Sequence, residues 1–342
     1  VGGRLIPELL RRGHTVSGGF TDTAKADRFW WSDQITPIEF DVSDKEQVLA
    51  GLQGIQTAYY LIHGLGGKDF MDKDRESAHI FADAAKEVGV RRIVYLSGIV
   101  PQIDEDKLSD HISSRLEVEK ILTSSGIPTY ALRAAILLGS GSTSFEIVRQ
   151  LSERLPVHTV PTWMQSQVQP IAVVDAVSAL AGCMELEGES RSYDIGGSQR
   201  MPYNELLSLF TDIAGLTRPE IDVPLLPTGL VGTLAGHIAD VPATTVASLV
   251  ESLHEDMVCH ETDFCADLLP QGYETVSVED AFRRALADPG ENTDPSQLDP
   301  VGPWPSDPGW AGGRVEIDEA GDTEKKGLLR SIKDRFVDDT SD

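Results

Sequence analysis

Two histidines and an arginine stand where their side chains could do chemistry. His63 follows the apolar run Thr57 to Ile62, and His111 begins a segment of helical pattern, His111 to Ser125. An imidazole titrates near neutrality, so His111 could act as an acid or a base. Arg115 stays protonated and can only hold a hydroxyl or an anion. The alternatives are a hydrogen-bonded structural histidine at a strand end for His63 and a solvated histidine at a helix start for His111.

A second group of residues has the types of metal ligands but not their spacing. Cys259-His260 and Cys265 lie near His254 and Asp256, and five residues separate the two cysteines. That spacing does not match a zinc knuckle. We therefore expect no metal site here.

The segments that must position these residues alternate as in a parallel sheet covered on both faces. The expected strands are Thr15 to Phe20, Pro37 to Phe40, Thr57 to Ile62, Arg92 to Leu96 and Thr129 to Leu132, and the expected helices are Lys45 to Leu52, Asp72 to Val88 and His111 to Ser125. Residues 1–140 are therefore predicted to form an α/β domain with a doubly wound parallel sheet. Such folds bind ligands at the carboxyl edge of the sheet.

Beyond residue 140 the alternation loosens. Helices are expected at Ser144 to Glu153, Val174 to Glu185 and Tyr203 to Ala214. We expect residues 141–287 to form a smaller α/β lobe over the carboxyl edge of the sheet. From Asp288 the chain is rich in Pro, Asp and Gly, which predicts a disordered acidic tail over 288–342. Within it, 325–337 predicts a short amphipathic helix that could make a weak peripheral contact with a membrane or an acidic partner.

Composition excludes several classes of function. The formal net charge of −26 repels nucleic acid and anionic membranes. The longest apolar stretch, Leu225 to Ala239, is interrupted by Pro227 and His237, so it predicts a buried helix rather than a transmembrane segment. Three cysteines are too few for a disulfide framework, and no signal-peptide pattern precedes the first helix, so we expect a cytoplasmic protein.

The first residues predict a helix already under way. Leu5, Ile6 and Leu9 share one face of Gly2 to Arg12, and Gly13 stands where a helix C-cap belongs. Several later segments, with this start, form an ordered series. They are Val1-Gly2-Gly3-Arg4-Leu5, Gly13-His14-Thr15-Val16, Phe40-Asp41-Val42, Ala58-Tyr59-Tyr60-Leu61-Ile62-His63, Arg92-Ile93-Val94-Tyr95-Leu96-Ser97-Gly98, Leu132-Arg133-Ala134-Ala135, Gln169-Pro170-Ile171-Ala172-Val173-Val174-Asp175 and Tyr193-Asp194-Ile195-Gly196-Gly197.

In order and spacing this series resembles the extended and atypical short-chain dehydrogenases/reductases, on the NmrA-like side of that superfamily, over residues 1 to 287. The resemblance implies a Rossmann fold that binds NADP or NAD. It makes Gly2 the third glycine of the T-G-x-x-G-x-x-G turn, whose backbone N–H groups meet the cofactor pyrophosphate at a helix N-terminus. The first strand and the first two glycines are then missing from the sequence, and we expect it to be a fragment or an incomplete gene model.

The resemblance also implies cofactor contacts at the strand ends. Thr21, with Lys25 nearby, follows the second strand and leans weakly toward NADP; both could equally be plain loop residues. Asp41 and Val42 end the third strand, near the adenine, although Asp41 could instead be an N-cap or turn residue. Leu61 and His63 lie near the nicotinamide ribose at the end of the fourth strand.

Active members of the superfamily use a Ser after the fifth strand and a Tyr-x-x-x-Lys on the next helix. Ser97 matches the first, whereas His111 takes the Tyr position and Arg115 the Lys position. Ser97 and His111 are therefore the candidate catalytic relay, and Arg115 is a candidate cofactor ligand. Two functions stay open: an NAD(P)H-dependent oxidoreductase or epimerase on a small carbonyl or sugar-like substrate, and a non-catalytic NAD(P)-binding redox sensor or assembly factor.

Overall fold

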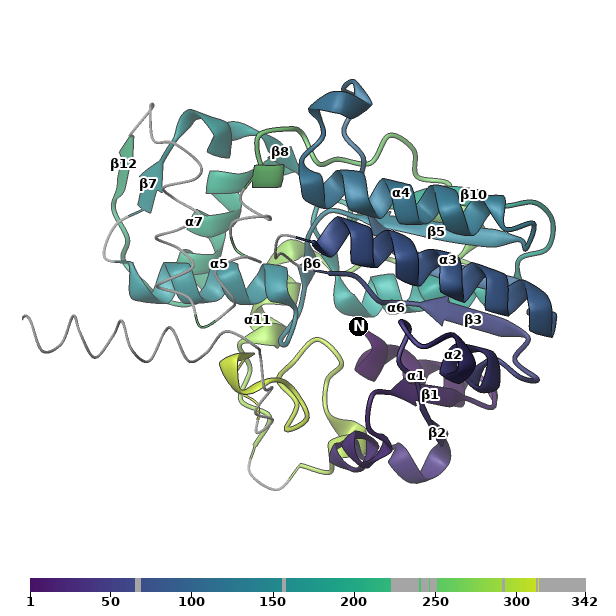
Figure 1. Ribbon diagram of the computed structural model, residues 1–342. Coiled ribbons are helices and arrows are strands. Elements are labelled where there is room, and N and C mark those ends of the chain that lie inside the picture. The colour runs from purple at the N-terminus through teal and green to yellow at the C-terminus, as the bar shows by residue number, and fades with distance from the viewer. Residues whose placement is uncertain are drawn as a thin grey trace, which may run out of the picture.

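The computed structural model describes residues 1–64, 69–155, 158–222, 240, 246, 251–290, 293–311 and 313 (Figure 1). Its main sheet has four parallel strands in the order β10–β5–β4–β3. They are β3 (Thr57–Tyr60), β4 (Arg92–Gly98), β5 (Thr129–Ala134) and β10 (Arg191–Ile195). All four carboxyl ends therefore lie along one edge of the sheet, as the sequence predicts for the site.

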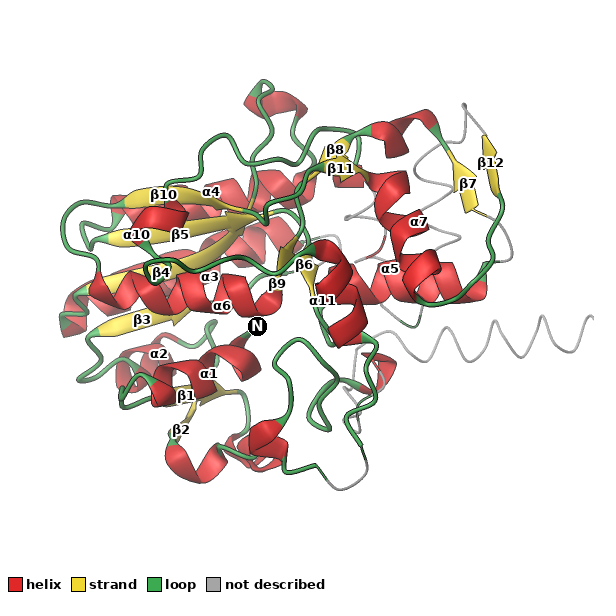
Figure 2. Cartoon of the chain, turned by 180° about the vertical axis from the view of Figure 1, so that it is seen from behind, coloured by secondary structure: helices red, strands yellow, loops and turns green. Residues whose placement is uncertain are grey.

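Helices cover both faces of this sheet (Figures 1 and 2). One face carries α3 (Phe70–Val88) and α4 (Asp110–Ser124), and the other carries α1 (Gly2–Arg11) and α6 (Val173–Gly182). Ile93 and Tyr95 of β4 are buried in the core beneath α3, whereas Val94 and Leu96 belong to the core that includes α1 and α6. Successive side chains of a strand point to opposite faces, so a sheet with two buried faces needs an unbroken apolar run. The predicted doubly wound α/β class is confirmed.

A separate pair of parallel strands, β1 (Ser17–Phe20) and β2 (Thr36–Glu39), precedes α2 (Lys45–Gly51). Among the described residues, no strand is hydrogen-bonded to both β1 and β3, so the parallel strands form two sheets rather than one. Asp44 caps α2 by accepting hydrogen bonds from the backbone N–H groups of Glu46 and Gln47.

The smaller lobe is built around three phenylalanines. Phe145, Phe210 and Phe282 pack with ring centroids 5.3 to 6.1 Å apart. Its elements are β6 (Leu137–Leu138), α5 (Thr143–Arg154), β7 (His158–Val160), β8 (Gln167–Val168), β9 (Ile171–Ala172), β11 (Met201–Pro202), α7 (Tyr203–Ile213), β12 (Glu220–Asp222) and α11 (Val278–Ala285). The short helix α10 (Phe264–Asp267) instead lies beside α6 and β10 of the main sheet. The predicted helices within 225–239 and 325–337 lie outside the described residues. None of the described helices is long and apolar enough to cross a bilayer.

The expectation of a disordered tail from Asp288 is wrong for residues 293–311, here called the C-terminal strap. Val301 and Trp304 in the strap are buried. Arg4 of α1 forms an ion pair with Asp307, and its guanidinium lies 4.2 Å from the ring centroid of Trp304. The prediction rested on too few apolar residues for a core, but the strap packs against a helix from the other end of the sequence, so it needs no core of its own.

Candidate functional site

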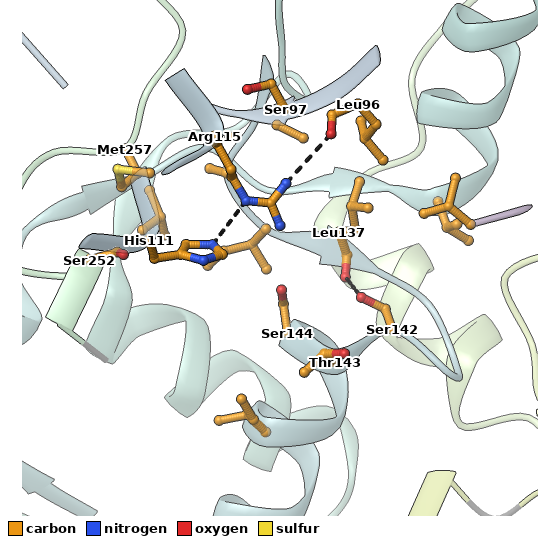
Figure 3. Close-up of a pocket in the computed structure, with 18 of the residues that line it drawn as sticks. Leu96, Ser97, His111, Arg115, Leu137, Ser142, Thr143, Ser144, Ser252 and Met257 are labelled. Carbon is orange, nitrogen blue, oxygen red and sulfur yellow. Dashed lines mark hydrogen bonds between the residues drawn. The ribbon is translucent and has the colours of Figure 1, made fainter. Parts of the chain in front are cut away.

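A cavity of about 260 Å³ lies at the carboxyl edge of the main sheet (Figure 3). Four of the predicted site residues line it: His63 beyond β3, Ser97 near the end of β4, and His111 and Arg115 on α4. The far wall is the start of α5, from Ser142 to Ser144. The structure thus brings together residues that are distant in sequence at the edge where parallel α/β sheets bind ligands.

His111 and Arg115 are one helical turn apart on α4, and their side chains touch. Arg115 Nε donates a hydrogen bond to His111 Nε2 at 3.0 Å. Since Nε2 must be unprotonated to accept it, the neutral ring carries its proton on Nδ1. Burial, and then the charge of Arg115, lower the pKa of His111 to about 3. His111 is therefore a neutral hydrogen-bond donor at physiological pH, and not the group titrating near neutrality that an isolated imidazole would be.

Arg115 is a cation whose charge is left without an ion-pair partner. Its Nη1 donates to the backbone oxygen of Leu96 at 3.5 Å, and burial lowers the pKa of its guanidinium. Asp74 lies close enough to act on that charge, but its carboxylate accepts from Gly64 N at 2.7 Å and Ser114 Oγ at 2.8 Å. Among the described residues, no carboxylate pairs with Arg115 and no Asp or Glu lines the cavity.

The field of Arg115 reaches His63 on the neighbouring strand end. Arg115 is the largest cause of a pKa for His63 well below its usual range, followed by burial. The side chain of His63 is nevertheless exposed at the cavity mouth. His63 is therefore a second neutral imidazole beside the same cation.

Ser97 lines the cavity, and its hydroxyl is buried. Its side chain is 3% exposed, and Oγ has no hydrogen-bond partner. No hydrogen bond joins it to His111 within the described part of the chain, so the two candidate relay residues share a cavity without forming a bonded relay. A buried hydroxyl without a partner is destabilising in isolation and suits a site where a ligand supplies the missing bond.

The remaining predicted cofactor residues lie outside this cavity, along the strand ends. Gly2 begins α1, and a Cβ at that position would lie 3.7 Å from the Leu61 side chain, so these two residues are neighbours. Thr21 Oγ1 accepts from Lys25 Nζ at 2.9 Å, on the surface after β1.

Asp41 and Val42 follow β2 and are engaged locally. The Asp41 carboxylate accepts from the backbone N–H and the hydroxyl of Ser43, at 2.9 and 2.6 Å, and these bonds lower the pKa of Asp41. Val42 packs against the core beneath α3. This geometry matches the alternative interpretation, in which Asp41 is a turn residue. The contact with adenine stays a prediction.

Sequence reasoning missed the loop that feeds α5. Its residues, Gly139-Ser140-Gly141-Ser142-Thr143-Ser144, line the cavity from Ser140 onward, and both glycines have positive φ, 154° and 76°. A Cβ on Gly141 would lie 2.8 Å from Asp307 Oδ1, so the close approach of the strap requires glycine there. A glycine- and serine-rich run directly before a helix was the available signal. Tyr203, at the start of α7, also lines the cavity and gave no signal of its own.

Comparison with known proteins supports the cofactor assignment. The NAD(P)H-binding family model matches residues 1–162. The comparison with curated protein sequences gives no match.

Solved structures share the fold at low sequence identity. The triphenylmethane reductase of Citrobacter sp., complexed with NADP(H), has a TM-score of 0.61 and 17% identity, with 83% of this chain and 95% of that chain covered. The NADPH-dependent quinone oxidoreductase of Escherichia coli has a TM-score of 0.63 and 17% identity, covering 82% and 94%. A nucleoside-diphosphate-sugar epimerase from Staphylococcus aureus has a TM-score of 0.65 and 13% identity, covering 82% and 95%.

The family match and the architecture agree with the resemblance seen in the sequence. The matched residues contain β1 to β5, α1 to α4 and every residue of the predicted cofactor set. Residues 1–162 therefore match an NAD(P)H-binding domain, for NADP or NAD, and the chain shares the fold of solved NADP(H)-dependent reductases and of a sugar epimerase.

Proposed function

We propose that this chain is an NAD(P)H-dependent oxidoreductase that reduces a small carbonyl compound in the cavity at the carboxyl edge of the sheet. The observation that carries the proposal is the convergence of Ser97, neutral His111 and unpaired Arg115 on that cavity. An epimerase on a sugar-like substrate would use the same hydride transfer in both directions. The solved structures of similar fold include proteins described as reductases and as epimerases.

The residues present fit a nicotinamide dinucleotide. Arg115 has charge and donors to spare for a ribose hydroxyl or a phosphate, and Gly2 opens a helix whose first N–H groups suit a pyrophosphate. The pair Thr21–Lys25 after β1 favours NADP, since a lysine can contact the 2′-phosphate. When bound, the nicotinamide supplies the hydride.

The chain's own residues would polarise the substrate. Ser97 donates its free hydroxyl hydrogen to the carbonyl oxygen, and neutral His111 donates from Nδ1. A neutral imidazole is an effective electrophile toward a carbonyl, and such prealigned donors are worth roughly a hundredfold or more in rate. The proton that completes the reduction would come from solvent that enters the cavity.

A non-catalytic NAD(P)-binding sensor is the second candidate. Its supporting observation is that His111, with a pKa of about 3, holds no transferable extra proton near pH 7, while Arg115 replaces the usual lysine. Turnover separates the two functions.

The test has two measurements. Nicotinamide fluorescence titration of the purified full-length chain gives the affinity for NADPH and NADH, and absorbance decay of bound NADPH is then followed with a quinone, a triphenylmethane dye and an aromatic aldehyde. We expect binding, tighter for NADPH, and turnover with at least one acceptor. Binding without turnover on any acceptor would favour the sensor, and absence of binding would refute both.

The free thiols of Cys183, Cys259 and Cys265 support the proposal of a reducing compartment such as the cytoplasm.

A further inference from the structure

We propose that the N-terminus of α5, facing Arg115 across the cavity, binds the carboxylate or phosphate of an otherwise apolar substrate. This assignment rests on the proposed reductase function and names its substrate class. The groups that carry it are the first-turn N–H groups of α5, the Ser144 hydroxyl, the Arg115 guanidinium and the hydroxyl of Tyr203, which lines the same cavity.

The first turn of α5 has donors to spare. Ser142 is the N-cap residue, but its hydroxyl donates to the backbone oxygen of Leu137 at 2.8 Å instead of capping the helix. The helical bonds begin with Glu146 N, which donates to Ser142 O. The N–H groups of Thr143, Ser144 and Phe145 therefore have no acceptor among the described residues, and they stand at the positive end of a twelve-residue helix dipole.

The opposite wall is a cation. Figure 3 shows the hydroxyl of Ser144 directed across the cavity toward the guanidinium of Arg115. Neither the Ser144 nor the Thr143 side chain forms a hydrogen bond within the described chain. An anion between the two walls would receive helix N–H groups on one side and a guanidinium on the other.

A buried hydroxyl at the same cavity independently points to a ligand. Tyr203 is 6% exposed, lines the cavity, and has its pKa raised by burial alone, without a hydrogen bond. Tyr203, a buried residue that lines the cavity without a hydrogen bond among the described residues, is therefore the polar group that a bound molecule would complete.

Charge and polarity define the class of ligand. The chain has 55 Asp and Glu residues against 29 Lys and Arg, yet among the described residues the charged side chains that line this cavity are Arg4 and Arg115 alone. Glu146, the acid nearest in sequence to the anion position, bonds Arg149 and Gly141 N and does not line the cavity. Apart from neutral polar side chains, the wall is apolar, including Ile112, Ile136, Ile147, Val168, Leu253 and Met257. An organic acid with an apolar body fits both features.

The test compares two ligands that differ by one charge, 4-formylbenzoate and its methyl ester. Isothermal titration calorimetry on the full chain, with and without NADPH, gives both affinities. We expect the acid to bind at least about tenfold more tightly than the ester, because an ion beside a guanidinium in a partly desolvated site gains well over one factor of ten. Phenyl phosphate, titrated in the same way, separates a preference for phosphate from one for carboxylate.

The variant Ser144→Asp places a negative charge in the proposed anion site. An acid in the first turn stabilises a helix, so this variant is expected to fold. It should weaken binding of 4-formylbenzoate at least about tenfold while changing ester and NADPH affinity less than about threefold. Ser144→Asn, which alters shape without charge, should retain most of the affinity for the acid. Ser198→Asp adds the same charge at an exposed serine outside the cavity and should change neither affinity.

Each other outcome overturns a defined statement. Equal binding of acid and ester, no detectable binding of the acid, or equal effects of Ser144→Asp and Ser198→Asp would overturn the anion site. If Ser144→Asp weakens NADPH as strongly as the acid, the helix binds a cofactor phosphate, and the substrate assignment is wrong. If the wild type does not bind NADPH but binds the acid more tightly than the ester, the proposed reductase function is refuted and the anion site is retained.

Discussion

Two arginines line the same cavity, and they are held in opposite ways. Arg4 is 9% exposed, and its Nε, Nη1 and Nη2 all donate to protein groups: the Asp307 carboxylate and the backbone oxygens of Gly302, Ser140 and Pro300. Arg115 gives one hydrogen bond to a neutral ring and a long one to Leu96 O, and no carboxylate within the described structure forms an ion pair with it. A buried cation whose donors are bonded to protein groups stabilises the fold, whereas a cation with unbonded donors is available to a ligand.

The largest effect is expected from breaking the buried ion pair of Arg4. Arg4→Met leaves the carboxylate of Asp307, which is 3% exposed, without its counter-charge. Removing one member of a buried ion pair lowers the free energy of unfolding by about 3–5 kcal/mol, and Arg4→Met/Asp307→Leu should recover much of it. Urea unfolding measures both. Arg11→Met, which breaks the surface pair with Glu8, is the control and should lower it by less than about 1 kcal/mol; equal losses for Arg4→Met and Arg11→Met would contradict the comparison.

The next largest effect is on turnover. Ser97→Ala should lower kcat about 100-fold, since it removes a donor to the developing oxyanion, while NADPH affinity changes less than about twofold. Stability should not fall, because the hydroxyl has no partner in the protein. Ser152→Ala removes another buried hydroxyl without a partner, away from the cavity, and is the matched control. Should the two variants turn over equally, Ser97 has no role in the chemistry.

Removing the available cation should affect binding and not stability. Arg115→Met is expected to weaken NADPH about tenfold, the value of one charge-assisted contact, because its charge is free for the cofactor. The free energy of unfolding should change by less than about 1 kcal/mol, since no carboxylate loses a partner. Fluorescence titration and urea unfolding provide the two values. A stability loss as large as that of Arg4→Met would show that Arg115 is also structural.

The last effect concerns the dependence of stability on pH. His111 has a pKa of about 3 in the folded chain against 6.5 when free, so the unfolded chain binds a proton that the folded chain excludes. The stability from this residue is complete above pH 6.5 and is lost as the pH falls toward 3, by at most about 1.4 kcal/mol per pH unit. Urea unfolding of the wild type and His111→Asn between pH 7 and 5 should therefore diverge, with the wild type losing more. Parallel curves would mean that His111 titrates normally.

Much of the fold followed from local pattern. The runs ending near Tyr60, Leu96 and Leu132 are continuous and apolar because both faces of their strands are buried, and such runs are readable without a structure. The grouping of Ser97, His111 and Arg115 followed from the family resemblance, because it fixes which strand ends and helix starts share an edge.

The contacts that decide the chemistry could not be predicted from the sequence. The bond from Arg115 Nε to His111 depends on rotamers, and it turns an expected acid–base residue into a neutral donor. The strap was misjudged because composition reports what a segment can bury alone, and Trp304 is buried against Arg4, which is distant in sequence. The loop before α5 carried a glycine signal, but its relation to Arg115 depends on the packing of the smaller lobe.

The pairing of Arg4 with Asp307 also constrains the order of events during synthesis. These residues are 303 positions apart, so α1 leaves the ribosome long before the carboxylate that neutralises it exists. Such a long loop is slow to close, and a nascent chain must keep Arg4 hydrated until the strap arrives. Ser140, at the start of the cavity loop, donates its hydroxyl to the same carboxylate. The wall of the cavity is therefore among the last parts of the molecule to become rigid, and a chain cut short before the strap would keep its sheet and lack a finished site.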